Sequence, residues 1–147
     1  MKTVTEKNTT IFKDRGSKFI SFIFPCKNLE VFDNELNALK KEYWDATHHC
    51  YAYRINPETE TEFSSDDGEP SGTAGLPILN QLKSYDIIDA GAVVIRYFGG
   101  TKLGKPGLIE AYGEGAKQVI EASNLLSIEQ VRFIEVRYPY PQENTVN

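Results

Sequence analysis

The chain has 147 residues, of which 40% are hydrophobic and 12% aromatic, so it is long and apolar enough for one domain with a packed core. Its formal net charge of -5 argues against a protein that is basic over its whole surface. It contains no apolar run of the roughly 18 residues that a membrane span needs, and its opening residues, "MKTVTEKNTT", lack the apolar core of a secretory signal.

The chain contains two cysteines, Cys26 and Cys50. Two cysteines at this spacing form neither a disulfide framework nor a metal-binding motif. We therefore expect reduced, mostly buried thiols in a cytoplasmic protein that needs no metal and no cofactor.

The elements of the first half follow from local pattern. "KFISFIF" (18–24) favours a strand, and "TTIFKDRG" before it is expected to form a hairpin with it through a turn at 14–16. Asn28 is a suitable N-cap for a helix whose apolar face carries Leu29, Phe32, Leu36, Leu39 and Tyr43. In "HCYAYRI" (49–55) alternate residues share a face, as in a strand, and a short exposed strand is expected within "NPETETEF".

In the second half, "AGLPILNQLKSY" predicts a short helix that tolerates Pro77 in its first turn. "AGAVVIRYF" predicts a buried strand, and a loop, "GGTKLGKPG", follows it. A helix is expected over "LIEAYGEGAKQVIEA", where small residues on one stripe indicate close packing on the sheet, and a last strand over "IEQVRFIEVRY".

The order of elements is ββαββαβαβ, which predicts an α+β domain over residues 1–138. We expect a two-layer α/β sandwich: a mixed sheet with the helices on one face. The polar segment 139–147, "PYPQENTVN", is expected to be a linker or the start of a further domain.

Charge is segregated along the chain. The segment 55–82 has no Lys or Arg and six acidic residues, whereas 96–107 has no acidic residue and three basic ones: Glu58, Glu60, Glu62, Asp66, Asp67 and Glu69 against Arg96, Lys102 and Lys105. Two solvated surface loops and two functional loops of opposite charge both fit this pattern.

The segment "RYFGGTKLGKPG" (96–107) lies between a strand and a helix, where glycines and a helix N-terminus suit a phosphate. Gly99, Gly104 and Lys105 meet most of the nucleotide-binding pattern G-x-x-x-x-G-K-[ST], but Pro106 replaces the hydroxyl that binds magnesium. This argues against an NTPase and leaves two alternatives, an anion-binding loop or a tight turn with incidental lysines.

His48 and His49 are adjacent, so on a strand they face apart and cannot easily share a metal ion. One histidine beside Asp67 or Glu69 is a candidate general base, and the alternative is a purely structural role for both. In "SSDDGEPSGTAG" (64–75), turn chemistry and helix capping by Ser71 or Thr73 account for the glycines and for one acid, but not for Asp67 and Glu69.

Four strings resemble the YigZ/IMPACT family: "GSKFI", "DATHHCYAYRI", "SDDGEPSGTAGLPIL" and "VVIRYFGGTKLGKPGLIEAYG". They occur in the family's order and cover most of residues 11–122. The resemblance implies a fold like the second domain of ribosomal protein S5 and a ferredoxin-like C-terminal domain after about residue 139. It implies a role near translation, with nucleic-acid binding as the usual suggestion, and it carries over no catalytic residues.

The leading hypothesis is a binding module for RNA, the ribosome or a translation protein. Tyr97 and Phe98 are candidates to stack on bases, and the set expected to contact phosphates is Arg15, Lys18, Arg96, Gly99, Gly100, Lys102 and Lys105.

Two alternatives remain open. One is a phosphate-handling enzyme that uses Asp66, Asp67, Glu69 and a histidine. The other is a pure protein-interaction domain whose acidic loop meets a basic partner. The sequence leaves the oligomeric state undetermined and predicts no membrane partner.

Overall fold

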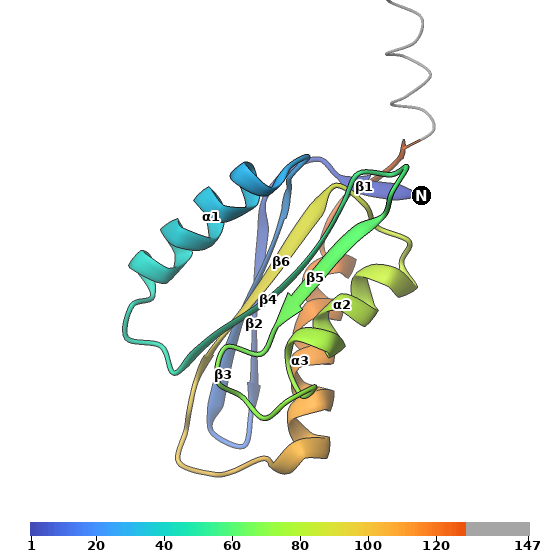
Figure 1. Cartoon of the computed structure of the whole chain (residues 1–147). Helices are drawn as coiled ribbons and strands as arrows, with labels where there is room; N and C mark the ends of the chain where they lie inside the picture. The colour runs from blue at the N-terminus through green and yellow to red at the C-terminus, as the bar shows by residue number, and fades with distance from the viewer. Residues whose placement is uncertain (129–147) are drawn as a thin grey trace, which may run out of the picture.

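A computed structural model describes residues 1–128 of the chain, and Figure 1 shows how its elements are arranged. These residues form three helices and seven strands. In chain order the elements are β1 (Lys2–Val4), β2 (Asn8–Asp14), β3 (Ser17–Pro25), α1 (Leu29–Glu42), β4 (His48–Ile55), β5 (Thr61–Ser65), α2 (Gly75–Ser84), β6 (Ala90–Tyr97), α3 (Gly104–Glu121) and β7 (Leu125–Ser127).

The main sheet has the strand order β2-β3-β6-β4-β5, and every pair of neighbours in it is antiparallel. The α+β class is therefore confirmed, whereas the expected mixed sheet is wrong. The reason lies in the crossovers. The connection through α1 makes β3 and β4 parallel to each other, but β6 lies between them and runs antiparallel to both. The connection through α2 likewise skips one strand, since β4 lies between β5 and β6.

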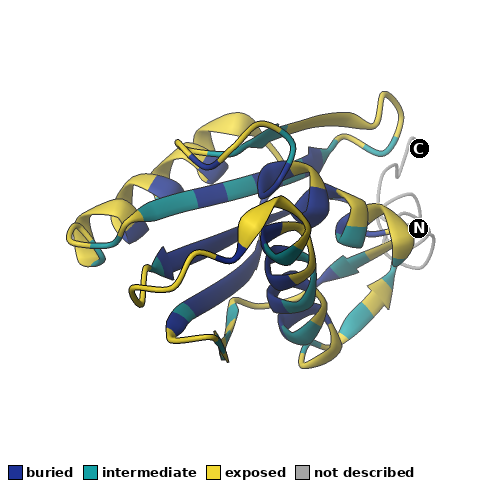
Figure 2. Cartoon of the chain, turned by 90° about the horizontal axis from the view of Figure 1, so that it is seen from below, coloured by how far each residue is buried: buried dark blue, intermediate teal, exposed yellow. Residues whose placement is uncertain are grey.

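Helices cover both faces of the sheet, which corrects the expectation of helices on one face (Figure 1). Because β3 and β6 are apolar on both sides, each face needs a cover (Figure 2). One core lies under α1 and includes Ile20, Phe22, Phe32, Leu36, Val93 and Ile95. The other lies under α2 and α3 and includes Phe19, Ile23, Ala92, Ile78, Leu82, Ala111 and Tyr112.

The local signals set several element ends correctly. The Asn28 side chain accepts a hydrogen bond of 2.9 Å from the Val31 amide and begins α1 as expected. Gly115 lets α3 approach the sheet closely, because an added Cβ there would lie 2.8 Å from Ser21 Oγ. By contrast, α3 begins at Gly104, four residues before the expected start, since a proline is compatible with a first helical turn.

A second, two-stranded sheet joins the two ends of the described chain. Strand β1 pairs antiparallel with β7, and neither strand was predicted. The expected final strand at 128–138 and the segment 139–147 lie outside the described residues apart from Ile128, so the boundary at 138 stays a prediction.

The hairpin between β2 and β3 supports the loop that follows β6. Its turn holds Arg15 and Gly16 at φ values of 47° and 86°, as a two-residue hairpin turn requires. The backbone of Gly99 packs directly on this turn, because a Cβ at Gly99 would overlap the carbonyl group of Gly16. This contact fixes where the loop that follows β6 leaves the sheet.

Within residues 1–128, no helix combines the length and the apolar composition that crossing a membrane requires.

The variant Gly99→Ala should lower the free energy of unfolding by about 1–3 kcal/mol, because the added methyl group displaces the hairpin turn. Urea denaturation measures the change. Gly113→Ala is the matched control. It replaces a glycine inside a helix, and its added Cβ would meet only the side-chain Nε2 of Gln81, at 3.9 Å. That control should gain about 0.5–1 kcal/mol. Equal unfolding midpoints for Gly99→Ala and the wild type would show that the close contact imposes no constraint.

Candidate functional site

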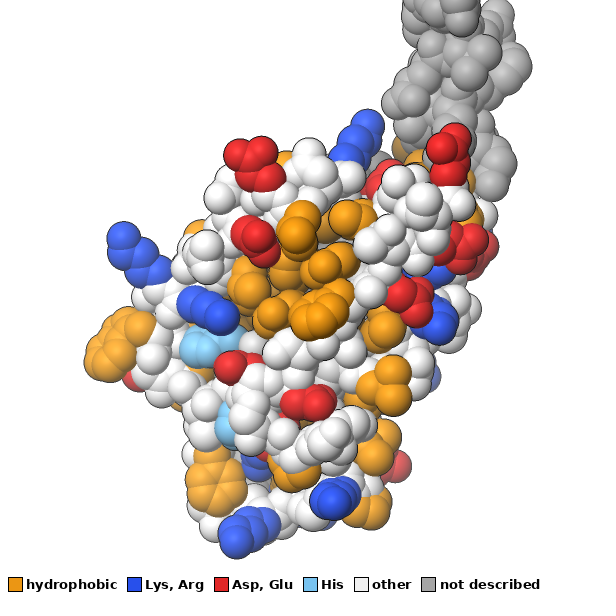
Figure 3. Space-filling view, viewed as in Figure 1, with side chains coloured by type: hydrophobic (Ala, Val, Ile, Leu, Met, Phe, Trp, Pro, Cys, Tyr) orange, Lys and Arg blue, Asp and Glu red, His pale blue; other side chains and the backbone are white. Residues whose placement is uncertain are grey.

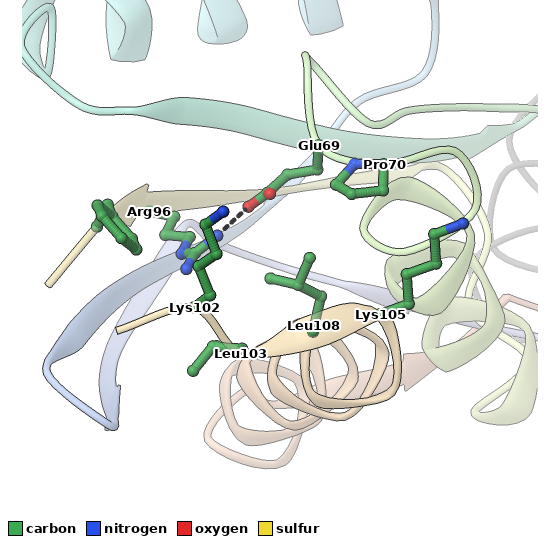
Figure 4. A pocket seen from close by; sticks show the side chains of 9 residues that line it. Glu69, Pro70, Arg96, Lys102, Leu103, Lys105 and Leu108 are labelled. Atoms are coloured by element: carbon green, nitrogen blue, oxygen red, sulfur yellow. Dashed lines mark hydrogen bonds and ion pairs between the residues drawn. The ribbon is translucent and has the colours of Figure 1, made fainter. Parts of the chain in front are cut away.

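The basic loop, residues 98–105, joins the end of β6 to the start of α3 and borders a pocket of about 380 Å³. Figure 4 shows Lys102, from the loop before α3, and Lys105, from the first turn of α3, on either side of Leu108. The opposite wall comes from the segment before α2, which supplies Glu69 and Pro70. The full lining is Glu69, Pro70, Arg96, Phe98, Lys102, Leu103, Gly104, Lys105 and Leu108.

The start of α3 is electropositive and lacks a side-chain cap. Within residues 1–128 no side-chain cap accepts a hydrogen bond at its start, and its first turn contains no acidic residue. Gly100 and Gly104 have φ values of 90° and 72°, which allow the loop to turn into the helix. Uncapped amides at a helix N-terminus and two adjacent lysines together favour an anion.

Arg96 lies in the floor of this pocket, but its charge is already paired. Its Nη1 donates a hydrogen bond of 2.8 Å to Glu69 Oε2, and the side chains of Arg96 and Glu69 are only 6% and 4% exposed. The Ser17 hydroxyl oxygen lies 3.3 Å from both Nε and Nη2. The guanidinium also lies over the rings of Phe19 and Phe98, at 5.8 and 5.4 Å. Arg96 therefore serves as a buried structural cation.

Glu69 joins the acidic loop to the basic side of the site. Besides Arg96, its Oε2 accepts a hydrogen bond of 2.5 Å from the Tyr112 hydroxyl on α3, and its Oε1 lies 3.5 Å from His48 Nε2. Burial, and after it the neighbouring Cys50 and Glu69, raise the pKa of Tyr112 far above its usual range, so the hydroxyl keeps its proton. The acidic loop thus joins the end of β6, just before the basic loop, through one buried ion pair.

The other two acids of the loop also have structural partners. Asp66 accepts hydrogen bonds of 2.9, 3.1 and 2.9 Å from the amides of Gly72, Ala74 and Gly75. It therefore caps the start of α2 from eight residues upstream, a role that the sequence suggested for Ser71 or Thr73. Asp67 accepts a bond of 2.6 Å from the His49 amide. All three carboxylates that seemed available for function bind within the domain.

The two histidines lie on opposite faces of β4, as their adjacency predicted. His48 is opposite Arg96, and its Nδ1 donates to the Asp67 carbonyl at 2.8 Å. His49 is opposite Ile95, and its Nε2 donates to the Tyr43 carbonyl at 2.8 Å. Among residues 1–128 no group of three or more His, Cys, Asp or Glu side chains is arranged to hold a metal ion.

The structure does not bring the whole predicted anion-binding set together. Arg96, Lys102 and Lys105 line the pocket, with Gly99 and Gly100 in the adjoining loop. Arg15 lies in the neighbouring hairpin turn and binds Asp14 through its Nε at 3.2 Å. Lys18 and Tyr97 lie on the face covered by α1. There the Lys18 ammonium stands 5.3 Å from the Tyr97 ring centre, and the Tyr97 hydroxyl donates to Asp45.

Sequence reasoning missed Ser17 and Tyr112, which complete the buried network around Arg96 and Glu69. Ser17 precedes a predicted strand, and Tyr112 belongs to the apolar stripe of α3, so both were assigned to the fold alone. The available signal was strand parity, because Ser17, Arg96 and His48 face the same side of adjacent strands.

Comparison with known proteins agrees with these features. The model of the Impact N-terminal domain matches residues 15–120, which include the basic loop and every residue of the buried network. The chain belongs to the IMPACT family.

Relatives within the family share this region at substantial identity. The chain is 40% identical over 122 residues to the IMPACT family member YvyE of Bacillus subtilis, covering 83% of this chain and 55% of YvyE. It is 38% identical over 114 residues to the family member YigZ of Escherichia coli, covering 76% of this chain and 56% of YigZ. The chain thus spans about half the length of these relatives.

A solved structure shares the fold. The crystal structure of a protein described as hypothetical superposes with a TM-score of 0.81 at 33% identity, and the match covers 85% of this chain and 62% of that one.

The variant Asp66→Asn should lower the free energy of unfolding at pH 7 by about 1–2 kcal/mol, because it removes the charge that caps α2. Although burial opposes ionisation, the three amides outweigh it and lower the pKa of Asp66 below its usual value. This stabilisation is complete above about pH 4 and is lost as the pH falls through the lowered pKa of the folded state. Urea unfolding from pH 7 to pH 2 should show the variant and wild-type curves converging in acid.

The control for this measurement is Asp33→Asn, which removes the same charge from an exposed position on α1. It should change the unfolding free energy by less than about 0.5 kcal/mol. A constant offset between Asp66→Asn and the wild type down to pH 2 would contradict the role given to the carboxylate.

The buried ion pair makes a second prediction. Glu69→Leu and Arg96→Met should each cost about 3–5 kcal/mol, because each leaves a buried charge without its partner. The double variant should cost much less than the sum, since it leaves neither charge. A double-mutant cycle by chemical denaturation measures this coupling, and additive losses would show that the pair does not stabilise the fold.

Proposed function

We propose that this domain is a translation-associated binding module that holds single-stranded RNA at the pocket beside α3. The observation that carries the proposal is the pairing of charges there. Arg96 is neutralised by Glu69, whereas Lys102 and Lys105 form no ion pair within residues 1–128 and stand beside the uncapped start of α3. The positive potential of the pocket therefore comes from groups that are free to meet an incoming phosphate.

The aromatic wall of the pocket supports a nucleotide over a bare anion. The Phe98 ring is 46% exposed, and the Arg96 guanidinium lies 5.4 Å from its centre. An exposed ring held in place from behind is a suitable platform for one base, and the lysines lie where the adjacent phosphates would pass. Tyr97 is less suited to this role, because its hydroxyl is bound to Asp45 on the opposite face.

The charge of the domain favours single strands over duplexes. Duplex binding depends on many phosphate contacts, and a chain with a net charge of -5 and two unpaired lysines at its site offers few. A single strand needs fewer phosphate contacts, and one stacked base with two such contacts matches Phe98 and the two lysines better than a duplex does.

The geometry supports binding more than catalysis. Asp66, Asp67 and Glu69 were the candidate catalytic acids, and each is held by hydrogen bonds within the domain. A general base has to reach a substrate, but Glu69 is buried against Arg96 and Asp66 is engaged by the amides before and at the start of α2. Membership of the family is the basis for a role near translation, and the buried free cysteines Cys26 and Cys50 support a cytoplasmic location.

The variant Lys102→Ala/Lys105→Ala should weaken the binding of fluorescently labelled single-stranded RNA, with a loss that grows as the salt concentration falls. Each phosphate contact on a single strand contributes about 0.7 to the slope of log affinity against log salt, so the double variant should lower that slope by about 1.4. Fluorescence anisotropy at four or five salt concentrations measures both quantities, with purified ribosomes tested in parallel.

The control is Lys40→Ala/Lys41→Ala, which removes the same charge from the last turn of α1, on the far face of the sheet. Its salt slope should equal that of the wild type. Phe98→Ala distinguishes an RNA site from a site for a bare anion. It should weaken the binding of RNA by about 1–3 kcal/mol and leave the binding of inorganic phosphate unchanged. Equal losses of RNA affinity in the two lysine double variants, or no RNA binding by the folded wild type, would contradict the proposal.

A further inference from the structure

A second surface lies on the opposite face of the sheet and plays no part in the RNA site. Helix α1 packs on this face through Phe32, Leu36 and Leu39. Its Phe32 ring contacts Tyr51 and Tyr53, so α1 covers part of β4 and leaves these tyrosines partly exposed. The aromatic surface, as we call it, consists of Tyr51, Tyr53 and Ile55 on β4 and Phe63 on β5. Figure 3 shows hydrophobic side chains gathered in this region beside α1.

The rings of this surface form one continuous cluster that runs from the core to the solvent. The ring centre of buried Phe32 lies 5.3 Å from that of Tyr51 and 4.8 Å from that of Tyr53. These two rings in turn lie 6.2 and 5.9 Å from Phe63, which is 51% exposed. The cluster therefore holds the outer ring in a fixed position, as a preorganised docking site requires.

The position of Phe63 is unusual for a strand at the edge of a sheet. Within residues 1–128, β5 pairs only with β4, so its other side is open. Edge strands usually carry charges or proline that discourage association. Here Phe63 lies opposite Tyr53 on the face that α1 covers only in part, and neither tyrosine hydroxyl of the surface forms a hydrogen bond in the described part of the chain. Aromatic rings with available hydroxyls are typical of protein interfaces.

The charges around the aromatic surface indicate the chemistry of its partner. Burial and, after it, the nearby Asp33 carboxylate of α1 raise the pKa of Tyr53. Glu60 of the turn between β4 and β5 pairs with Arg54, whose side chain lies on the opposite face of β4, so it does not border the tyrosines. The lysines of α1, Lys40 and Lys41, lie at the other end of that helix, in its last turn. The surface is thus aromatic with the Asp33 carboxylate at its edge.

We propose that the aromatic surface docks a protein segment in which Lys or Arg side chains alternate with apolar residues. The apolar residues would pack on Tyr53 and Phe63. The cations would meet Asp33 or lie over the tyrosine rings, which attract cations. This inference does not depend on the RNA site, since the two surfaces lie on opposite faces of the sheet.

The test uses a phage-displayed library of random twelve-residue peptides selected on the wild-type domain. The enriched peptides should carry net positive charge and apolar residues. In 15N-labelled protein they should shift the amide resonances of residues 51–55 and 61–65. Phe63→Ala should weaken a selected synthetic peptide at least about tenfold, as for the loss of a central aromatic anchor. Asp33→Asn should weaken it by a smaller factor and reduce its dependence on salt.

Phe98→Ala is the matched control, because it removes an equally exposed phenylalanine from the RNA site. It should leave peptide binding unchanged, and Phe63→Ala should leave RNA binding unchanged, so the two proposals fail separately. Four results overturn the inference: no enriched peptide, enriched peptides without Lys or Arg, resonance shifts elsewhere, or an affinity that is insensitive to Phe63→Ala. A concentration-dependent dimer that Phe63→Ala abolishes would assign the surface to a second copy of the chain instead.

Discussion

The buried ion pair between Arg96 and Glu69 is the constraint on which the site depends. It joins the end of β6 to the segment before α2, while Ser17 ties it to β3 and Tyr112 ties it to α3. Removing two charges from water is costly, and these additional hydrogen bonds are what offset the cost. The pair thereby holds three parts of the site together, because β6, the segment before α2 and α3 each contribute one member of the network.

The same pair decides which charges can act outside the domain. A sequence with three basic residues in twelve positions suggests a site with three cations, but Glu69 neutralises the charge of Arg96 in an ion pair. The acidic stretch divides in the same way. Glu69 is buried and Asp66 binds the amides at the start of α2, whereas Asp67 accepts from the His49 amide and keeps its side chain 40% exposed.

Local features of the fold were predictable from the sequence, and pairings between distant residues were not. The 3.6-residue spacing and Asn28 defined α1, and alternation defined β4, because those signals lie within a few residues of each other. The order of the strands was not predictable, since it depends on β6 entering between β3 and β4. The cap of α2 by Asp66 was not predictable for a similar reason. An N-cap side chain ordinarily binds an amide two or three residues further on, whereas Asp66 lies eight residues before the Ala74 amide that it binds.

The alternation of β4 explains how one small domain presents two surfaces of different chemistry. Its even-numbered residues, His48, Cys50 and Ala52, face the side where the pocket beside α3 lies, and its odd-numbered tyrosines face the side of α1. Because the sheet separates the surfaces, a ligand on one does not block the other. Their charges also differ in sign, since lysines border the pocket and Asp33 lies near Tyr53. Under the two proposals, this difference would favour RNA at the pocket and a basic segment at the aromatic surface.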